Sequence, residues 1–220
     1  NKIVASALVV IDRTSLGLST WDIPRGPLGE KGEGKWEKEL MKCILKDAKT
    51  EGCMCLYYSP LSPFPFPLSL VSPRHEQPEA TRIVDISKDD ESILSQMHQK
   101  GRYNIKVAQK NGVSVRQSQE IQAYYDLMKQ TGERDRFGIK PLSHYKAFLE
   151  RLPGTFLLLA YKDETPIAGL LGCIYGNVGI YYYGASSHEY RALMAPYLLQ
   201  WEAIQYCKKQ GCASYDLLGV

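Results

Sequence analysis

Two tyrosines near the end of the chain have a spacing that could bind a polar ligand. Tyr181 and Tyr183 lie two residues apart within Val178–Tyr183, an apolar and aromatic run that predicts a strand. Side chains alternate between the two faces of a strand, so we expect both tyrosines on one face and Tyr182 on the other. The pattern favours either a pair of ligand-binding phenols or the half-buried face of an aromatic strand.

Single charged residues in loops and at strand ends are further candidates for a catalytic or ligand-binding role. Asp216 lies at the end of a predicted strand, Ser214–Leu218, where its carboxylate could accept a proton from an amine. Arg25 stands in a loop made rigid by flanking prolines, where it either contacts a ligand or clamps backbone carbonyls. Arg134 and Asp135 are adjacent, which favours an internal ion pair that fixes a turn.

A basic stripe lies on a long predicted helix between a Ser87 cap and Gly112. Arg102, Lys106 and Lys110 recur every four residues and therefore share one face. That face is either solvated or in contact with phosphates. It lies away from an apolar stripe formed by Leu94, Met97, Gly101, Ile105 and Ala108.

Several common catalytic patterns are absent from the sequence. There is no glycine-rich dinucleotide or phosphate loop, no His-Glu-x-x-His and no Gly-x-Ser-x-Gly. The 4 histidines are scattered and the 6 cysteines lack paired zinc spacings, so we expect no metal site and reduced, packed thiols. The net charge of +3 permits an anionic partner without requiring one.

The elements that would position these residues form a repeat. The first part of the chain predicts two strands, a loop, a long helix and a strand, and the last third predicts the same series. The first copy comprises Lys2–Val10, Leu18–Ile23, Trp36–Thr50 and Cys53–Tyr57. The second comprises Pro166–Ile174, Val178–Tyr183, a helix ending at Lys209 and Ser214–Leu218. We therefore expect two related lobes with a crevice between them.

The predicted fold is mixed α/β (α+β), with mostly antiparallel sheets flanked by helices. Residues 1–86 form a first lobe that includes a proline-rich connector at 59–78, residues 87–112 a linking basic helix, and residues 113–220 a second lobe. The order of elements in the second lobe resembles that of a GNAT-type N-acyltransferase. Both ends fall next to predicted strands, so we expect both lobes to be truncated.

The loops that would hold coenzyme A in such a fold have the wrong composition. That coenzyme needs a glycine-rich loop whose amides bind the pyrophosphate. The equivalents here are Ile23–Leu28, where prolines supply no amide hydrogen, and Gly184–Arg191. Two GNAT-like lobes without this loop require another acyl donor.

Five blocks of the sequence resemble, in order, the motifs of the FemABX family of peptidoglycan aminoacyltransferases. The first is similar to the family's proline-arginine-glycine-proline motif, the second to its lysine-threonine-arginine-tyrosine-asparagine-isoleucine helix, and the third to its threonine…arginine-aspartate-x-phenylalanine turn. The blocks are Asp22–Pro27, Met97–Lys106, Thr131–Phe137, Tyr181–Trp201 and Tyr215–Gly219. They span nearly the whole chain.

The resemblance implies a cytoplasmic enzyme, working at the inner face of the membrane if its acceptor is lipid-linked. The donor would be an aminoacyl-tRNA, and the acceptor an amine on the stem peptide of a UDP-linked or lipid-linked peptidoglycan precursor. No cofactor and no metal is implied. An aminoacyl ester is already activated, so positioning matters more than a strong nucleophile.

The resemblance also assigns roles to individual residues. Lys140, Tyr181 and Tyr183 would hold the diphosphate of the acceptor. Lys140 stands where the family often has arginine, and lysine supplies a point charge without the bidentate fork. His144 replaces a tyrosine four residues on.

Three further residues receive binding roles and one a catalytic role. Arg102 and Lys106 would meet phosphates of tRNA or nucleotide, and Arg25 would contact substrate. Asp216 is the candidate catalytic base.

The sequence departs from the family pattern in two further places. Gly101 replaces the threonine of the helix motif. A helical arm has no room, because the predicted helix Ser143–Leu152 runs directly into the strand Thr155–Tyr161. Two alternatives therefore stay open: a coenzyme-A-dependent GNAT N-acyltransferase, and a non-catalytic protein of this fold that binds wall precursors or tRNA.

Overall fold

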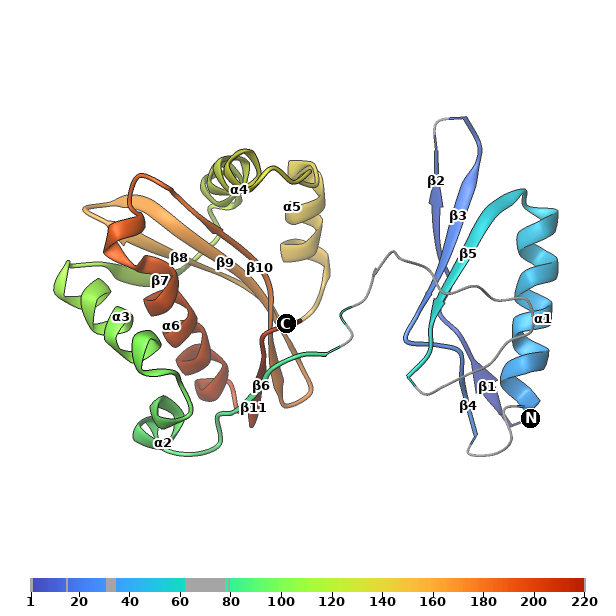
Figure 1. The fold of residues 1–220 in the computed structure, drawn as a ribbon, viewed down its shortest axis with the longest axis horizontal. Coiled ribbons are helices and arrows are strands. Elements are labelled where there is room, and N and C mark those ends of the chain that lie inside the picture. Colours follow the sequence, from blue (N-terminus) through green and yellow to red (C-terminus); the bar gives the residue numbers. More distant parts are fainter. Residues whose placement is uncertain (1, 15, 31–34, 62–77, 79, 220) are drawn as a thin grey trace. The chain divides into compact units, whose positions relative to one another are not determined.

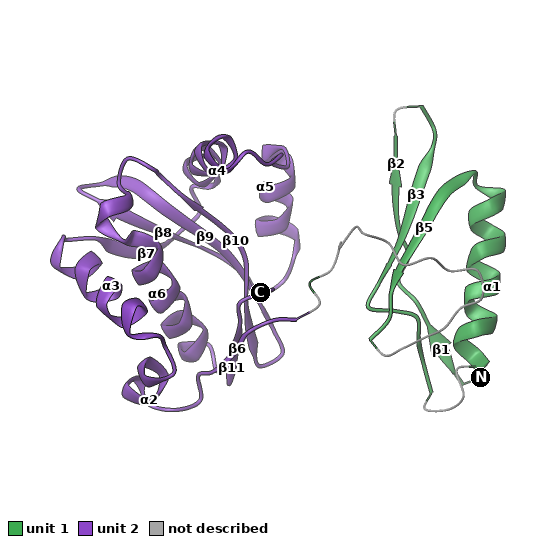
Figure 2. Cartoon of the chain, in the orientation of Figure 1, with its two compact units in different colours: residues 1–79 green, residues 80–220 purple. Residues whose placement is uncertain are grey.

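The computed structural model describes residues 2–14, 16–30, 35–61, 78 and 80–219. It divides into two compact units, Asn1–Glu79 and Ala80–Val220, shown separately coloured in Figure 2. Each unit contains sheets flanked by helices, so the mixed α+β class predicted from the sequence is confirmed (Figure 1). Most of the proline-rich connector, residues 62–77, lies outside the described residues.

The first unit is a small three-stranded sheet covered by one helix. Strands β2 (Val10–Arg13) and β3 (Ser19–Pro24) are antiparallel, and β5 (Cys53–Ser59) runs parallel to β3 after helix α1 (Lys35–Thr50). A two-stranded ribbon joins β1 (Ala5–Ser6) to β4 (Leu28–Gly29). The unit is held by a cluster of Trp21, Ile23, Met41, Ile44 and Ala48, in which the apolar stripe of α1 packs on β3.

The predicted first strand, Lys2–Val10, is wrong in its bounds. Only Ala5–Ser6 is a strand there, and the strand that pairs with β3 begins at Val10. The hairpin turn sets this register: the Thr14 amide donates to the Leu18 carbonyl at 2.8 Å, and Gly17 takes a φ of 79°. A turn fixes the register of the strands it joins, so it places Val10 opposite Asp22.

The second unit is built on a six-stranded sheet with the order β6-β11-β10-β9-β8-β7. The strands are β6 (Ile83–Asp85), β7 (Ser114–Ser118), β8 (Thr155–Lys162), β9 (Thr165–Tyr175), β10 (Val178–Ser186) and β11 (Ser214–Asp216). The helices are α2 (Asp90–Ser95), α3 (Gln99–Lys110), α4 (Ile121–Asp135), α5 (Leu142–Arg151) and α6 (Ala195–Lys209), preceded by a 3₁₀ turn, η1 (Arg191–Leu193).

Two apolar cores cover the two faces of this sheet. One contains residues of α2, α3 and α6, with Phe156, Leu158 and Leu170 from the strands. The other contains residues of α4 and α5, with Leu157, Leu159 and Leu171. Neighbouring strand residues thus alternate between the cores, and both faces of the sheet are buried, which accounts for the nearly continuous apolar run of β8 and β9.

The predicted repeat is confirmed in topology. In the first unit an antiparallel pair, β2 and β3, is followed by α1 and by β5 parallel to β3. In the second unit β9 and β10 are antiparallel, and α6 then leads to β11, which is parallel to β10. Each helix ends at a glycine in the left-handed region, Gly52 (φ 66°) and Gly211 (φ 86°), where glycine avoids strain.

The boundary between the units differs from the predicted division at residues 86 and 112. Strand β6 pairs with β11 and α3 packs against α6, so both belong to the second unit. The predicted single helix is also two helices. Asp89 caps α2 by accepting the Ser92 amide at 2.8 Å, and His98 caps α3 by accepting the Lys100 amide at 3.2 Å. Two N-caps within ten residues divide the helix.

Candidate functional site

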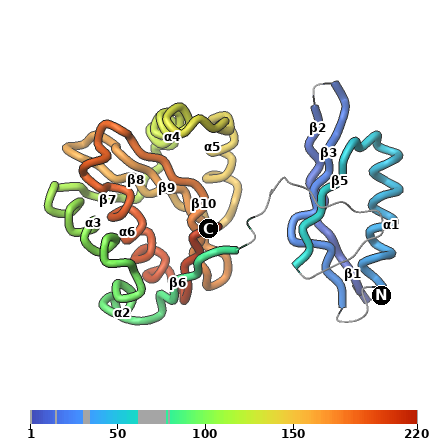
Figure 3. Tube along the Cα trace, in the orientation of Figure 1, coloured from blue at the N-terminus to red at the C-terminus, as the bar shows by residue number. Residues whose placement is uncertain are grey.

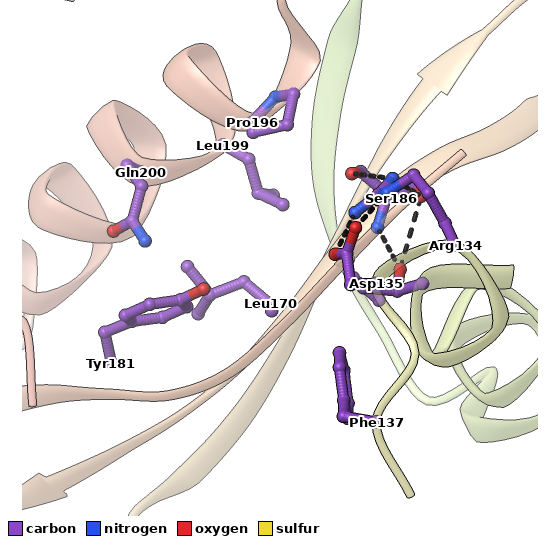
Figure 4. A pocket seen from close by; sticks show the side chains of 13 residues that line it. Arg134, Asp135, Phe137, Leu170, Tyr181, Ser186, Pro196, Leu199 and Gln200 are labelled. Atoms are coloured by element: carbon purple, nitrogen blue, oxygen red, sulfur yellow. Dashed lines mark hydrogen bonds and ion pairs between the residues drawn. The ribbon is translucent and has the colours of Figure 1, made fainter. Parts of the chain in front are cut away.

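A cavity opens in the second unit where β10 and β11 part. The two strands are paired only along Val178–Ile180 and Ser214–Asp216, whereas β10 continues to Ser186 along β9. The cavity, of about 350 Å³, lies between β10, the start of α6 and the end of α4. Its wall includes Leu170, Tyr181, Leu199 and Gln200 on one side and Arg134, Asp135 and Phe137 on the other (Figure 4).

The end of α4 closes the cavity by binding the free edge of β10. The Ser186 amide donates to Thr131 Oγ1 at 3.0 Å, and Arg134 Nη1 donates to the Ser186 carbonyl at 3.1 Å. Asp135 holds the same guanidinium through two hydrogen bonds of 2.8 and 2.7 Å (Figure 4). The predicted Arg134–Asp135 ion pair is therefore confirmed, and it sits at the cavity wall.

Gly132 allows α4 to end in this way. A Cβ there would lie 2.6 Å from Ile139 Cγ2 and 3.1 Å from the Phe137 carbonyl oxygen, so any larger residue would force Ile139 to move. Arg136 completes the turn in the left-handed region with a φ of 58°. The motif that the sequence showed at Thr131–Phe137 thus shapes one wall of the cavity.

Two polar groups point into the cavity from its opposite wall. Tyr181 lies over Gly184, whose missing side chain leaves room for the phenol ring. The Tyr215 hydroxyl donates to Gln200 Oε1 at 2.9 Å, which orients the amide and leaves Gln200 Nε2 as a donor. Of the described residues that line this cavity, none is a histidine or a cysteine.

The expectation that Tyr181 and Tyr183 share one face of β10 is wrong. A β-bulge between them shifts the register, so that Tyr181 pairs with Gly172 and Tyr183 with Leu171. An extra residue in one strand reverses the alternation beyond it. Tyr181 consequently packs on the α6 side of the sheet and Tyr183 on the α4 and α5 side.

Tyr183 instead joins a second polar cluster at the start of α5. Its hydroxyl lies 3.0 Å from His144 Nε2. Tyr145 packs edge-on against both rings, and its hydroxyl accepts the backbone amide of Lys140 at 3.3 Å. The exposed Lys140 is thus linked through one residue to the His144–Tyr183 pair.

Burial keeps the phenols of both sites protonated. It raises the pKa of Tyr181, and it raises that of Tyr183 to about 12. At neutral pH these groups are hydrogen-bond donors and not bases. The hydrogen-bonded ion pair raises the pKa of Arg134 and lowers that of Asp135, so both stay charged.

The other candidate residues are not among those that line the cavity. Arg102 donates to the carbonyls of Leu94 and Met97, a structural role at the α2–α3 junction, whereas Lys106 is exposed on α3. Asp216 accepts the Thr81 hydroxyl and the Leu218 amide. Arg25 is exposed in the turn after β3 of the first unit, with a φ of 52°.

The loop between β10 and α6 has several of its amides already in use. Those of Ser187, Arg191, Leu193, Met194 and Tyr197 donate to carbonyls within the protein. Pro196, in the first turn of α6, has no amide hydrogen. These donors are not free to hold a pyrophosphate.

Sequence reasoning assigned no site role to Arg134, Asp135, Phe137, Ser186 or Gln200. The sequence signal that could have found Arg134, Asp135 and Phe137 was the Thr131–Phe137 block, whose polar residues we expected to act only within a turn.

Among the described residues, no group of histidine, cysteine and acidic side chains could hold a metal ion. None of the described helices has the length and apolar character needed to cross a bilayer.

The six-stranded sheet, in which β10 and β11 pair only at one end, defines an acyltransferase fold of the GNAT type. A GCN5-related glucosamine N-acetyltransferase region of a fungal β-N-acetylglucosaminidase has the same fold, with a TM-score of 0.54 and 14% identity, covering 98% of this chain and 29% of that chain. The crystal structure of FemX aligns more closely, with a TM-score of 0.76 and 18% identity over 100% of this chain and 77% of that one.

A sequence profile of the FemAB family matches residues 71–161 and 155–220, more than half of the chain. The chain belongs to the FemAB family. A curated relative is the lipid II:glycine glycyltransferase of Staphylococcus epidermidis, 23% identical over 209 aligned residues, which cover 65% of this chain and 50% of the relative. The chain thus spans about half the length of the curated relatives it matches.

Proposed function

We propose that this protein is an aminoacyltransferase that acts on a peptidoglycan precursor. The donor is an aminoacyl-tRNA, and the acceptor is an amine of the stem peptide. Family membership and the glycyltransferase relatives support this class of reaction. The observation that carries the proposal is a cavity with two neutral donors, Tyr181 and Gln200, opposite a charged Arg134–Asp135 pair.

The reaction needs no covalent intermediate on the protein. The neutral amine attacks the ester carbonyl carbon, the new C–N bond forms, and the bond to the ribose oxygen breaks. The amine loses one proton and the leaving ribose hydroxyl gains one. A cavity without a histidine or cysteine suits this direct transfer.

Tyr181 and Gln200 would stabilise the charge that develops on the carbonyl oxygen. Both present a hydrogen-bond donor from the same wall, and each is fixed by packing or by a hydrogen bond. Preorganised donors of this kind favour the tetrahedral intermediate over the planar ester. The Arg134–Asp135 pair would orient the donor, its carboxylate suiting the ammonium group that an aminoacyl ester carries.

The cluster of Lys140, His144 and Tyr183 is the proposed acceptor site. Lys140 supplies charge for a diphosphate, and the Tyr183 phenol supplies a donor held in place by His144. Arg102, Lys106 and Arg25 remain candidates for phosphate contacts elsewhere, and Asp216 for proton acceptance. A cytoplasmic site of action, with membrane contact for a lipid-linked acceptor, fits this reaction.

The test of the reaction is Tyr181→Phe. The ring still fills the space over Gly184 and only the hydroxyl is lost, so we expect kcat for transfer from charged tRNA to fall about a hundredfold. Thermal stability and muropeptide affinity should stay unchanged. Tyr175→Phe, at a tyrosine that is 81% exposed, is the control and should transfer normally. Normal turnover by Tyr181→Phe would exclude the proposed role.

The coenzyme-A alternative makes a different prediction. It requires backbone amides for a pyrophosphate, and in the β10–α6 loop the amides of Ser187, Arg191, Leu193 and Met194 are engaged. Calorimetric titration with acetyl-CoA should therefore show no binding. Saturable muropeptide binding without any transfer from charged tRNA would instead favour the non-catalytic alternative.

A further inference from the structure

The outward face of helix α3 carries charge of one sign. Among the α-helices that the structure describes, α3 is the only one without an acidic residue. Lys100, Lys106 and Lys110 are exposed on it, and within the described part of the chain none of them is in an ion pair. Arg102 does not belong to this face, because its guanidinium is bound to two carbonyls at the α2–α3 junction.

The other helices of the second unit balance their lysines with carboxylates. In each of α4, α5 and α6 a lysine lies 2.7 to 3.9 Å from an acidic side chain; these pairs are Lys129–Asp126, Lys146–Glu150 and Lys208–Asp90. A protein surface usually intersperses the two signs in this way, and a face of one sign attracts a partner of the opposite charge. The uncompensated face of α3 therefore differs from an ordinary solvated helix face.

An exposed aromatic ring stands among the α3 lysines. Tyr103 is 66% exposed. It lies three residues from both Lys100 and Lys106 and seven from Lys110, spacings that place all four side chains on one helix face. The buried residues of α3 lie on the opposite side of the helix. Lys100, Tyr103, Lys106 and Lys110 thus form one surface, the α3 basic surface.

This combination of side chains fits single-stranded RNA. Lysines neutralise the phosphates of a nucleic acid, and unpaired bases stack on exposed aromatic rings. An anionic membrane would match the charge, but a helix that binds in the membrane interface inserts an apolar face. The apolar face of α3 is buried within the second unit, and the neighbouring exposed residue, Gln99, carries an amide.

The surface begins near the proposed catalytic cavity. Helix α3 packs along α6 (Figure 3). Gly101, which directly follows Lys100, lines a small cavity together with Pro196 and Gln200 of α6. The same two residues of α6 line the cavity that contains Tyr181. The first turn of α3 and the catalytic cavity therefore lie against the same turn of α6.

We propose that the α3 basic surface binds the single-stranded 3′ end of an RNA donor. Tyr103 stacks on an unpaired base, and the lysines contact the phosphates on either side of it. The inference rests on the proposed function for the identity of this RNA as an aminoacyl-tRNA. The surface itself rests on charge, exposure and the lack of acidic partners.

The direct test is binding of a synthetic RNA hairpin with a single-stranded 3′ CCA end to the full chain. The triple variant Lys100→Gln, Lys106→Gln, Lys110→Gln should raise the Kd about tenfold or more in fluorescence titrations. The slope of log Kd against log salt concentration should fall by about 2 to 3, because three phosphate contacts are lost. No binding by the unaltered protein, or an unchanged Kd in the variant, would overturn the proposal.

A matched triple variant controls for net charge. Lys38→Gln, Lys46→Gln, Lys49→Gln removes the same charge from exposed positions on α1, a helix that also carries acidic residues. Its Kd for the hairpin should stay within about twofold of that of the unaltered protein, since diffuse charge adds little at physiological salt. An equal loss in both triple variants would show that RNA responds only to net charge, and the α3 surface would then be rejected.

Tyr103→Ala tests the stacking contact. It should raise the Kd about tenfold for the hairpin with the single-stranded end and leave binding of a blunt hairpin unchanged. Alanine suits a helix, so the melting temperature should not fall. Tyr175→Ala, at a tyrosine that is 81% exposed outside α3, is the control and should bind both hairpins normally. An equal loss on both hairpins in Tyr103→Ala would exclude stacking on an unpaired base.

Two further measurements separate the alternatives. If the α3 triple variant loses binding to phosphatidylglycerol vesicles but keeps binding to the hairpin, the surface is a membrane contact and the RNA proposal falls. In transfer from charged tRNA, the same variant should raise KM about tenfold with kcat unchanged. An unchanged KM would reject the RNA surface and leave the proposed function intact. If the unaltered protein transfers nothing yet binds RNA as described, the aminoacyltransferase proposal fails and the RNA surface stands.

Discussion

His144 Nε2 and the hydroxyl of Tyr183 lie 3.0 Å apart and join helix α5 to strand β10. The bond orients a half-buried phenol toward the start of α5, close to Lys140. The proposed acceptor site therefore depends on two elements that are far apart in the sequence, α5 and β10.

Replacing Lys140 by alanine should weaken binding of a UDP-muropeptide. The side chain is exposed and makes no structural contact that its loss would break, so the cost is that of one charge-assisted contact, about 1–3 kcal/mol. Titration calorimetry measures it. Lys146→Ala, an exposed lysine of the same region, is the control. An unchanged dissociation constant for Lys140→Ala would remove this residue from the site.

Replacing Gly184 by alanine should destabilise the second unit by about 1–3 kcal/mol, the usual range for overpacking. The new Cβ would overlap the Tyr181 hydroxyl, so the ring must leave its place in the cavity. Chemical denaturation gives the free energy of unfolding. Gly138→Ala is the matched control, since nothing lies within 4 Å of a Cβ there. Equal stabilities of the two variants would show that Tyr181 moves at no cost.

Replacing Arg134 by glutamine should lower kcat/KM for transfer about tenfold to a hundredfold. The change removes the ion pair with Asp135 and the hydrogen bond to Ser186, so the edge of β10 loses its anchor. Steady-state kinetics with charged tRNA test this. Arg116→Gln breaks an exposed ion pair with Glu164 and should leave the rate unchanged. A normal rate for Arg134→Gln would mean that the anchor is dispensable.

Stability should fall as the pH rises above about 9. Burial raises the pKa of the Cys207 thiol from 9.0 to about 12, so the unfolded chain loses this proton first. The contribution to stability is complete below pH 9 and disappears progressively up to pH 12. Cys207→Ala should flatten this decline in urea titrations at several pH values, and the exposed Cys43→Ala should not. A slope unaffected by Cys207→Ala would contradict this account.

The repeat and most elements could be predicted because they depend on local hydrophobic periodicity. Helix α1 was expected at Trp36–Thr50 and lies at Lys35–Thr50, and β8 was expected at Thr155–Tyr161 and lies at Thr155–Lys162. Amphipathic helices and buried strands leave such patterns without regard to their partners. These elements lie where the sequence placed them to within one residue.

Features that depend on distant partners could not be predicted. The bulge between Tyr181 and Tyr183 arises from pairing with β9, and it separates two tyrosines that spacing alone places together. Strand β6 joins β11 across more than a hundred residues, which no local pattern shows. The cavity wall formed by Arg134 and Ser186 likewise joins two segments 52 residues apart.

The pairing of β6 with β11 has a practical consequence for the design of truncated forms of this chain. A recombinant fragment that starts at Val113 would leave the outer edge of β11 bare, with unpaired amides and carbonyls that invite intermolecular sheet growth. Such a fragment would also lack Thr81, whose hydroxyl steadies the carboxylate of Asp216. Expression of the second unit should therefore begin no later than Ala80.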